Sequence, residues 1–175
     1  MIGDEDIKIF SIAKGDKATR EQLSGKPDKA VVSAAKNLGK SLAVEFIEAV
    51  NQPIDDETDS EMLLQRQFLL SFTVTVSLET YCEDTVAGIA QKQFLDYLRN
   101  KSLVIYKNSS DTGAFTFYYL AFRRGSEVDR RIGQTFAMLC SHDGDPIYQE
   151  LGEALYCWFS SVVRRKAAAA GLLKE

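Results

Sequence analysis

The stretch that decides the fold runs from Gln67 to Leu78, QFLLSFTVTVSL, and none of its twelve residues carries a charge. Across the whole chain, 26% of residues are charged. This contrast predicts that the segment forms the centre of a buried core. Twelve uncharged residues fall short of the roughly 20 that cross a bilayer, so we expect no membrane association.

The same stretch fits two secondary structures. Phe72, Val74, Val76 and Leu78 alternate with hydroxyl residues, which is the two-residue period of a half-buried strand. The segment also fits a helix that is apolar on almost every side. We favour the buried helix, because no turn signal separates the segment from a helical run that opens with a capping box, Thr58 and Glu61.

Two further segments predict amphipathic helices, residues 28–50 and residues 84–100. Apolar residues recur there at spacings of three and four, which places them on one helical face. In the first segment this face comprises Val31, Ala35, Leu38, Leu42, Phe46 and Ala49. In the second it comprises Val86, Ala90, Phe94, Tyr97 and Leu98.

Residues 103–122 leave an alternative open. The polar run 108–113 could be the loop of a β-hairpin between 103–107 and 114–122. It could also hold a serine, Ser109 or Ser110, that caps a helix. We favour the helix.

The last third predicts two helices. Ser126 and Asp129 resemble a capping box for the first. Asp145 is placed to cap the second, with Pro146 at its first position, where the missing N–H is not needed. The inward face expected for the final helix comprises Ile147, Leu151, Leu155, Trp158 and Val162.

We therefore expect an all-α protein, an irregular bundle of five to six helices. A loosely packed arm, residues 1–27, precedes one helical domain, residues 28–175. The alternative is an α+β fold with a small hairpin at residues 103–122.

Composition points to the cytoplasm. The first residues, MIGDEDIKIF, carry acids where a secretion signal would carry positive charge. The three cysteines, Cys82, Cys140 and Cys157, are odd in number and lack CxxC spacing, so we expect buried free thiols. A net charge of −4 disfavours binding to the nucleic-acid backbone, so we expect no nucleic-acid partner.

One segment resembles a nucleotide-binding motif. Residues 34–41, AAKNLGKS, resemble the P-loop NTPase signature with alanine in place of the first glycine. The chemistry needs a glycine-rich loop whose amides wrap phosphate. Ala34 to Lys36 are strong helix formers inside an amphipathic pattern, so we expect ordinary helix and no cofactor.

No residue is assigned to catalysis or to a metal. His142 is the only histidine, which rules out HExxH, and the Glu-x-x-His pairs of di-metal bundles are absent. An enzyme would have to use carboxylates such as Glu79 and Glu83, or a Cys–His pair formed by tertiary folding. We expect a noncatalytic protein.

Two sets of residues suggest binding. Arg123, Arg124, Arg130 and Arg131 could converge on an anion if the turn at Gly125 brings the two pairs together. The second set consists of aromatic residues of a kind that anchors protein interfaces, namely Tyr148, Tyr156, Trp158 and Phe159.

The aromatic set carries the functional expectation. Tyr156 and Phe159 lie off the face expected to point inward, which would leave aromatic surface exposed. We therefore expect a protein-interaction or self-associating domain, with itself as a homodimer or another protein as partner. A small-molecule or anion-binding regulatory domain is the alternative.

Overall fold

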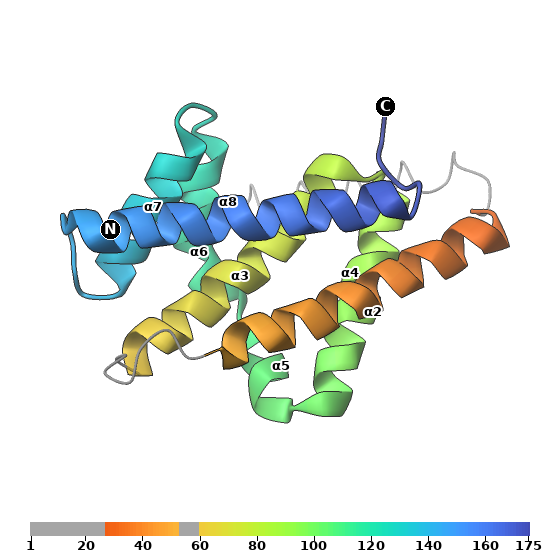
Figure 1. Ribbon diagram of the computed structural model, residues 1–175, viewed down its shortest axis with the longest axis horizontal. Coiled ribbons are helices and arrows are strands. Elements are labelled where there is room, and N and C mark those ends of the chain that lie inside the picture. Colours follow the sequence, from red (N-terminus) through yellow and green to blue (C-terminus); the bar gives the residue numbers. More distant parts are fainter. Residues whose placement is uncertain (1–26, 53–59) are drawn as a thin grey trace, which may run out of the picture.

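A computed structural model describes residues 27–52 and 60–175, which fold into seven helices and no strand (Figure 1). In chain order the helices are α2 (Lys29–Asn51), α3 (Ser60–Tyr81), α4 (Asp84–Lys101), α5 (Leu103–Ser109), α6 (Thr112–Arg123), α7 (Val128–Leu139) and α8 (Pro146–Ala169). The all-α prediction is confirmed for these residues, and the α+β alternative is wrong. Residues 1–26 of the expected arm and the cap at Thr58 lie outside the described residues.

The expected count of five to six helices is wrong because residues 103–123 form two helices. Ser110 ends α5, and the Asp111 carboxylate accepts a hydrogen bond from the Gly113 amide at 2.9 Å in the first turn of α6. Asp111, rather than Ser109 or Ser110, therefore bonds the opening turn of α6.

Helix α3 is the buried centre that the uncharged stretch predicts. Every residue from Leu69 to Leu78 is buried. The two threonine hydroxyl groups within this run bond to the preceding turn: Thr73 donates to the Leu69 carbonyl at 2.7 Å, and Thr75 donates to the Ser71 carbonyl at 3.3 Å. The serine hydroxyl groups bond to neighbouring helices, Ser71 to the Ser109 carbonyl and Ser77 to Ser160. These hydroxyl residues can therefore occupy a buried helix, because each bond removes the cost of an unpaired hydroxyl.

The alternating pattern arises because α3 separates two hydrophobic clusters. Leu70, Val74 and Leu78 join the first cluster, which contains residues of α2, α4 and α8. Leu69, Phe72 and Val76 join the second, which contains residues of α6, α7 and α8. Figure 1 shows α3 crossing behind α8, with α6 and α7 towards one end and α2 and α4 towards the other. A helix packed on both sides shows no single apolar face.

Helix α2 continues without interruption through the segment that resembles a P-loop. Ala35, Leu38 and Gly39 are buried there, while Lys36 and Lys40 are exposed. A side chain at Gly39 would collide with the Ala90 backbone carbonyl of α4. This glycine therefore allows α2 and α4 to approach each other closely, and the segment is ordinary helix.

The starts of α7 and α8 differ in how well the sequence predicted them. Asp145 caps α8 by accepting from the Ile147 amide at 2.9 Å, with Pro146 in the first turn, as expected. The capping box at Ser126 and Asp129 is wrong, because Glu127 is the N-cap, in the left-handed region at φ 47°, and makes no side-chain cap hydrogen bond. Ser126 instead accepts a hydrogen bond from Arg131.

Candidate functional site

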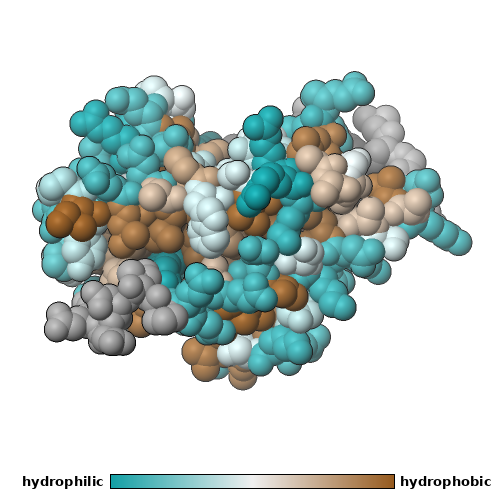
Figure 2. Space-filling view, in the orientation of Figure 1, coloured by the Kyte–Doolittle hydropathy of each residue, from teal (hydrophilic) through white to brown (hydrophobic). Residues whose placement is uncertain are grey.

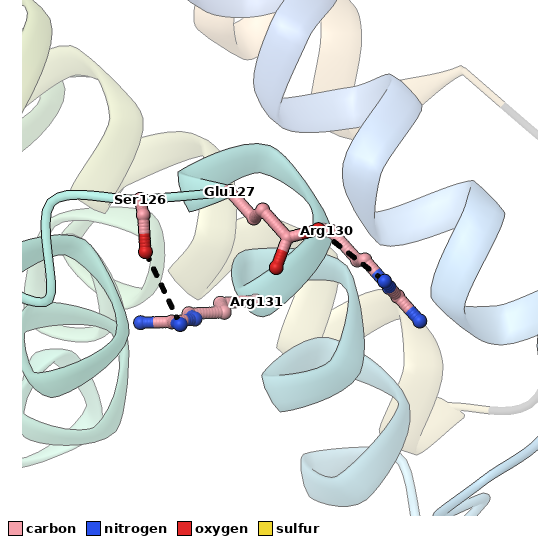
Figure 3. A network of polar contacts seen from close by, with 4 residues as sticks. All are labelled: Ser126, Glu127, Arg130 and Arg131. Carbon is pink, nitrogen blue, oxygen red and sulfur yellow. Dashed lines mark hydrogen bonds and ion pairs between the residues drawn. The ribbon is translucent and has the colours of Figure 1, made fainter.

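The four arginines expected to bind an anion are placed around the turn between α6 and α7. Arg123 and Arg124 are exposed at the end of α6. Arg130 donates to the Glu127 carboxylate at 3.4 Å, and Arg131 donates to the Ser126 hydroxyl at 3.3 Å. Figure 3 shows these two guanidinium groups pointing to opposite sides of the first turn of α7. The structure does not bring Arg130 and Arg131 together around a common ligand.

The aromatic residues expected at an interface divide into buried and exposed members. Phe159 is 0% exposed and Tyr156 is 8% exposed, so both pack inside the protein. Tyr148 is half-buried and stacks on His142, with ring centroids 3.8 Å apart. Trp158 is 42% exposed. Of this set, Trp158 presents the large aromatic surface to solvent.

The inward face expected for the final helix is wrong at Ile147 and Trp158, which are exposed, whereas Val162 is buried and Leu151 and Leu155 are partly buried. The observed face is rotated from the expected one, because the structure also buries Gly152, Tyr156, Phe159, Ser160, Val163 and Ala167. Glycines at the α7–α8 contact set this rotation: a side chain at Gly133 would meet the Gln149 carbonyl, and one at Gly152 would meet Phe136. The two helices approach at these positions, which turns Ile147 and Trp158 outward.

The opposite side of α8 forms a helix face with exposed apolar residues that none of the described residues covers. Its exposed residues include Ile147, Ala154, Cys157, Trp158 and Ser161. Ile147 is 74% exposed, more than any other large hydrophobic residue in residues 27–52 and 60–175. In Figure 1 α8 runs across the near side of the molecule, and Figure 2 shows hydrophobic surface along its N-terminal half. We call this the outer face of α8.

Charge on the outer face changes sign along the helix. Glu150 is exposed towards the N-terminal end, and Arg164 and Arg165 are exposed towards the C-terminal end. Neither Glu150 nor Arg165 has an ion-pair partner within the part of the chain that the structure describes. A surface approaching this face would therefore meet an acidic end and a basic end.

Cys157 lies near the middle of the outer face and is exposed, whereas Cys82 and Cys140 are buried. The expectation of three buried thiols is wrong for Cys157. Partial burial raises the pKa of the Cys157 thiol to about 11, and the Asp129 carboxylate adds to this by its charge and by accepting a hydrogen bond. The thiol is accessible but stays protonated near neutral pH, so it is a poor nucleophile.

A serine and a lysine also meet where α8 contacts α2. Lys166 donates to the Ser41 hydroxyl at 2.9 Å and pairs with the Glu45 carboxylate at 3.2 Å. Serine–lysine pairs can act in nucleophilic catalysis when the lysine is neutral. Here the Lys166 ammonium bonds both Ser41 and Glu45 of α2, so the arrangement acts as a clamp between the two helices.

Metal chemistry finds no support among the described residues. No group of three or more His, Cys, Asp or Glu side chains lies close enough together there to hold a metal ion. His142 is instead 3.9 Å from the Asp145 carboxylate, beside Tyr148.

Within the described ranges, no helix has both the length and the hydropathy needed to cross a membrane.

Sequence reasoning missed Ile147 and Cys157 as surface residues. The signal that could have identified this face is the spacing of Ile147, Ala154, Ser161 and Ala168 at seven-residue intervals. Gly133 and Gly152, which lie within helices where α7 packs against α8, add to this signal.

No protein-family model, curated protein or solved structure matches the chain.

Proposed function

We propose that this protein is a noncatalytic domain that associates with a second copy of itself through the outer face of α8. The observation that carries the proposal is the joint exposure of Ile147 and Trp158 on one side of one helix. The two side chains lie eleven residues apart on this side of α8, about 16 Å along the helix. An exposed tryptophan is the kind of anchor that supplies much of the binding energy in a protein interface.

The surroundings of Trp158 support this role. Its ring lies 5.3 Å from the buried Phe159 ring, so it is held against the core and loses little freedom on binding. Small exposed residues, Ala154 and Ser161, flank it on the same face and would allow another helix to approach closely. Burial of the outer face by a second copy would remove both large apolar side chains from water.

Light scattering coupled to size exclusion tests the proposal. We expect the wild-type protein to show twice its monomer mass at micromolar concentration and to dissociate on dilution. Trp158→Ala should raise the dissociation constant by about 30-fold or more, which corresponds to the 2 kcal/mol typical of an anchor residue.

The matched control is Leu120→Ala on α6, which removes another exposed large hydrophobic side chain that lies outside the outer face. It should leave the mass unchanged. A monomeric wild type, or equal effects of the two substitutions, would contradict the proposal, and far-ultraviolet circular dichroism would confirm that each variant is folded.

We also propose that the protein works in the cytoplasm. The proposal is supported by the cysteines, since Cys82, Cys140 and Cys157 form no disulfide with one another, which is typical of a reducing compartment.

A further inference from the structure

Resting on the proposed self-association, the charge order along α8 points to a specific arrangement of the dimer. We infer that two copies pack their α8 helices antiparallel through the outer face, with the twofold axis passing beside Cys157 and Trp158. The inference depends on three features of this face, namely the spacing of its small residues, the order of its charges and the register that both share.

Ile147 and three small residues define a straight line of contact. Ile147, Ala154, Ser161 and Ala168 follow one another at intervals of seven residues, and all four are exposed. Residues seven apart lie on nearly the same side of a helix, with a drift of only about 20° per interval. Short side chains along such a line let two helix backbones come together with few obstacles.

The charges distinguish antiparallel from parallel pairing. In a parallel pair, Glu150 would face the partner's Glu150 and Arg165 would face the partner's Arg165, so like charges would meet at both ends. In an antiparallel pair, Glu150 faces the partner's Arg165, and symmetry repeats that contact at the other end. Opposite charges arranged in this way fix the orientation and register of an interface.

The same register matches the remaining positions. Placing Glu150 opposite the partner's Arg165 also places Ala154 opposite the partner's Ser161 and Ile147 opposite the partner's Ala168. Small residues therefore meet small residues, and Ile147 covers a methyl group. The midpoint of every pair falls between residues 157 and 158, which puts the exposed tryptophan at the centre, where interface anchors concentrate.

Cysteine crosslinking tests the register. Because Cys157 lies next to the proposed axis, oxidation near pH 11, where the thiol ionises, should convert the wild-type dimer to a covalent dimer on nonreducing gels, and Cys157→Ser should abolish it. In the Cys157→Ser background, Ala168→Cys should not crosslink, since the antiparallel register separates the two new thiols by roughly 32 Å along the helices. Adding Ile147→Cys to that variant should restore crosslinking. The buried Cys82 and Cys140 are present throughout and serve as an internal reference.

Charge exchange gives a second readout that does not depend on oxidation. Glu150→Arg and Arg165→Glu should each raise the dissociation constant by about tenfold, because each places like charges at both symmetric contacts. The double exchange should return it to within about threefold of the wild-type value. Additive losses in the double variant would overturn the antiparallel register.

These experiments distinguish the antiparallel arrangement from the proposed self-association on which it rests. Efficient crosslinking of Ala168→Cys alone would show a parallel pair and overturn the arrangement. A dimer that is sensitive to Trp158→Ala but gives no crosslink at Cys157 would also overturn the arrangement while self-association stands. A wild-type protein that stays monomeric at every concentration would remove both.

Discussion

Ser77 of α3 donates a hydrogen bond to Ser160 of α8 over 3.0 Å, inside the protein. The Tyr81 hydroxyl lies 3.2 Å from the same Ser160 oxygen, so three hydroxyl groups join the central helix to the last one. Ser160 and Phe159 lie on the buried side of α8. This polar contact therefore helps to hold the rotation that directs Trp158 to solvent.

A double-mutant cycle should detect this coupling. We expect Ser160→Ala to lower the free energy of unfolding by about 1 to 2 kcal/mol, because it leaves the buried Ser77 hydroxyl unsatisfied. Ser77→Ala should cost less, because Ser160 keeps the Tyr81 hydroxyl as a partner. The double variant should lose less than the sum of the two, since the unsatisfied Ser77 hydroxyl is also removed. Denaturant unfolding measures all three, with the exposed Ser33→Ala as control. Simple additivity would show that the contact contributes nothing.

The glycine at the α2–α4 contact should not tolerate a side chain. Gly39→Ala places a methyl group against the Ala90 backbone carbonyl, which cannot move without shifting α4. We expect a loss of about 1 to 3 kcal/mol, the usual cost of overpacking. Gly88→Ala is the matched control, because Gly88 is exposed in α4 and has open space around it. That change should stabilise the protein by up to about 1 kcal/mol through helix propensity. Equal effects at the two glycines, measured by thermal unfolding, would be inconsistent with the close approach.

A buried arginine should stabilise the end of α2. Arg66 is 3% exposed, and its guanidinium donates to the Val50 carbonyl at 2.6 Å and to the Gln52 carbonyl at 3.0 Å. The positive charge lies at the negative end of the helix dipole, while burial lowers the pKa of Arg66 below its ordinary value.

Arg66→Met should keep the aliphatic contacts but leave those carbonyls without the guanidinium. We expect it to cost about 1.5 to 3 kcal/mol in denaturant unfolding, as for other hydrogen bonds to charged groups. Arg124→Met, an exposed arginine at the end of α6, provides the control and should change stability by less than about 0.5 kcal/mol. If both variants unfold at the same denaturant concentration, Arg66 does not have this role.

The sequence predicts most of the fold because helix signals are local. The ends of α2 and α4 agree with prediction to within one residue, since apolar spacing and nearby breakers define them. The identity of α3 as helix was harder to predict, because Phe72 and Val74 point into different hydrophobic clusters and so imitate a strand pattern. Packing on both sides is a tertiary property that a local pattern does not contain.

The candidate surface was harder still to predict. Apolar residues occur almost all around α8, so periodicity does not decide whether Trp158 or Phe159 points inward. The decision depends on close contacts at Gly133 and Gly152, which involve two helices at once. The arginines show the same limit, because the directions of Arg130 and Arg131 depend on the left-handed turn at Glu127.

The reactivity of Cys157 should reveal the influence of α7 on the outer face. With its pKa raised from 9.0 to about 11, the thiol should react with iodoacetamide about 100-fold more slowly at pH 8 than an ordinary exposed cysteine. The rate should rise through pH 10 to 11. Because the thiolate is negative, removing a nearby negative charge favours it, so Asp129→Asn should lower the pKa and speed labelling at pH 8. The measurement is mass spectrometry of dilute protein, in which the outer face is free.

The free energy of unfolding should also depend on the ionisation of the Cys157 thiol. A thiol whose pKa is higher in the folded protein than in the unfolded chain contributes stability that is complete below pH 9 and disappears as pH rises towards 11. Cys157→Ser should therefore reduce the loss of stability between pH 9 and pH 11. Glu153→Gln should lower the pKa of the Cys157 thiol less than Asp129→Asn does, because Glu153 acts on the thiol only through its charge and less strongly. A labelling midpoint near pH 9 in the wild type, unchanged by Asp129→Asn, would show that the carboxylate of α7 does not contact the outer face at Cys157.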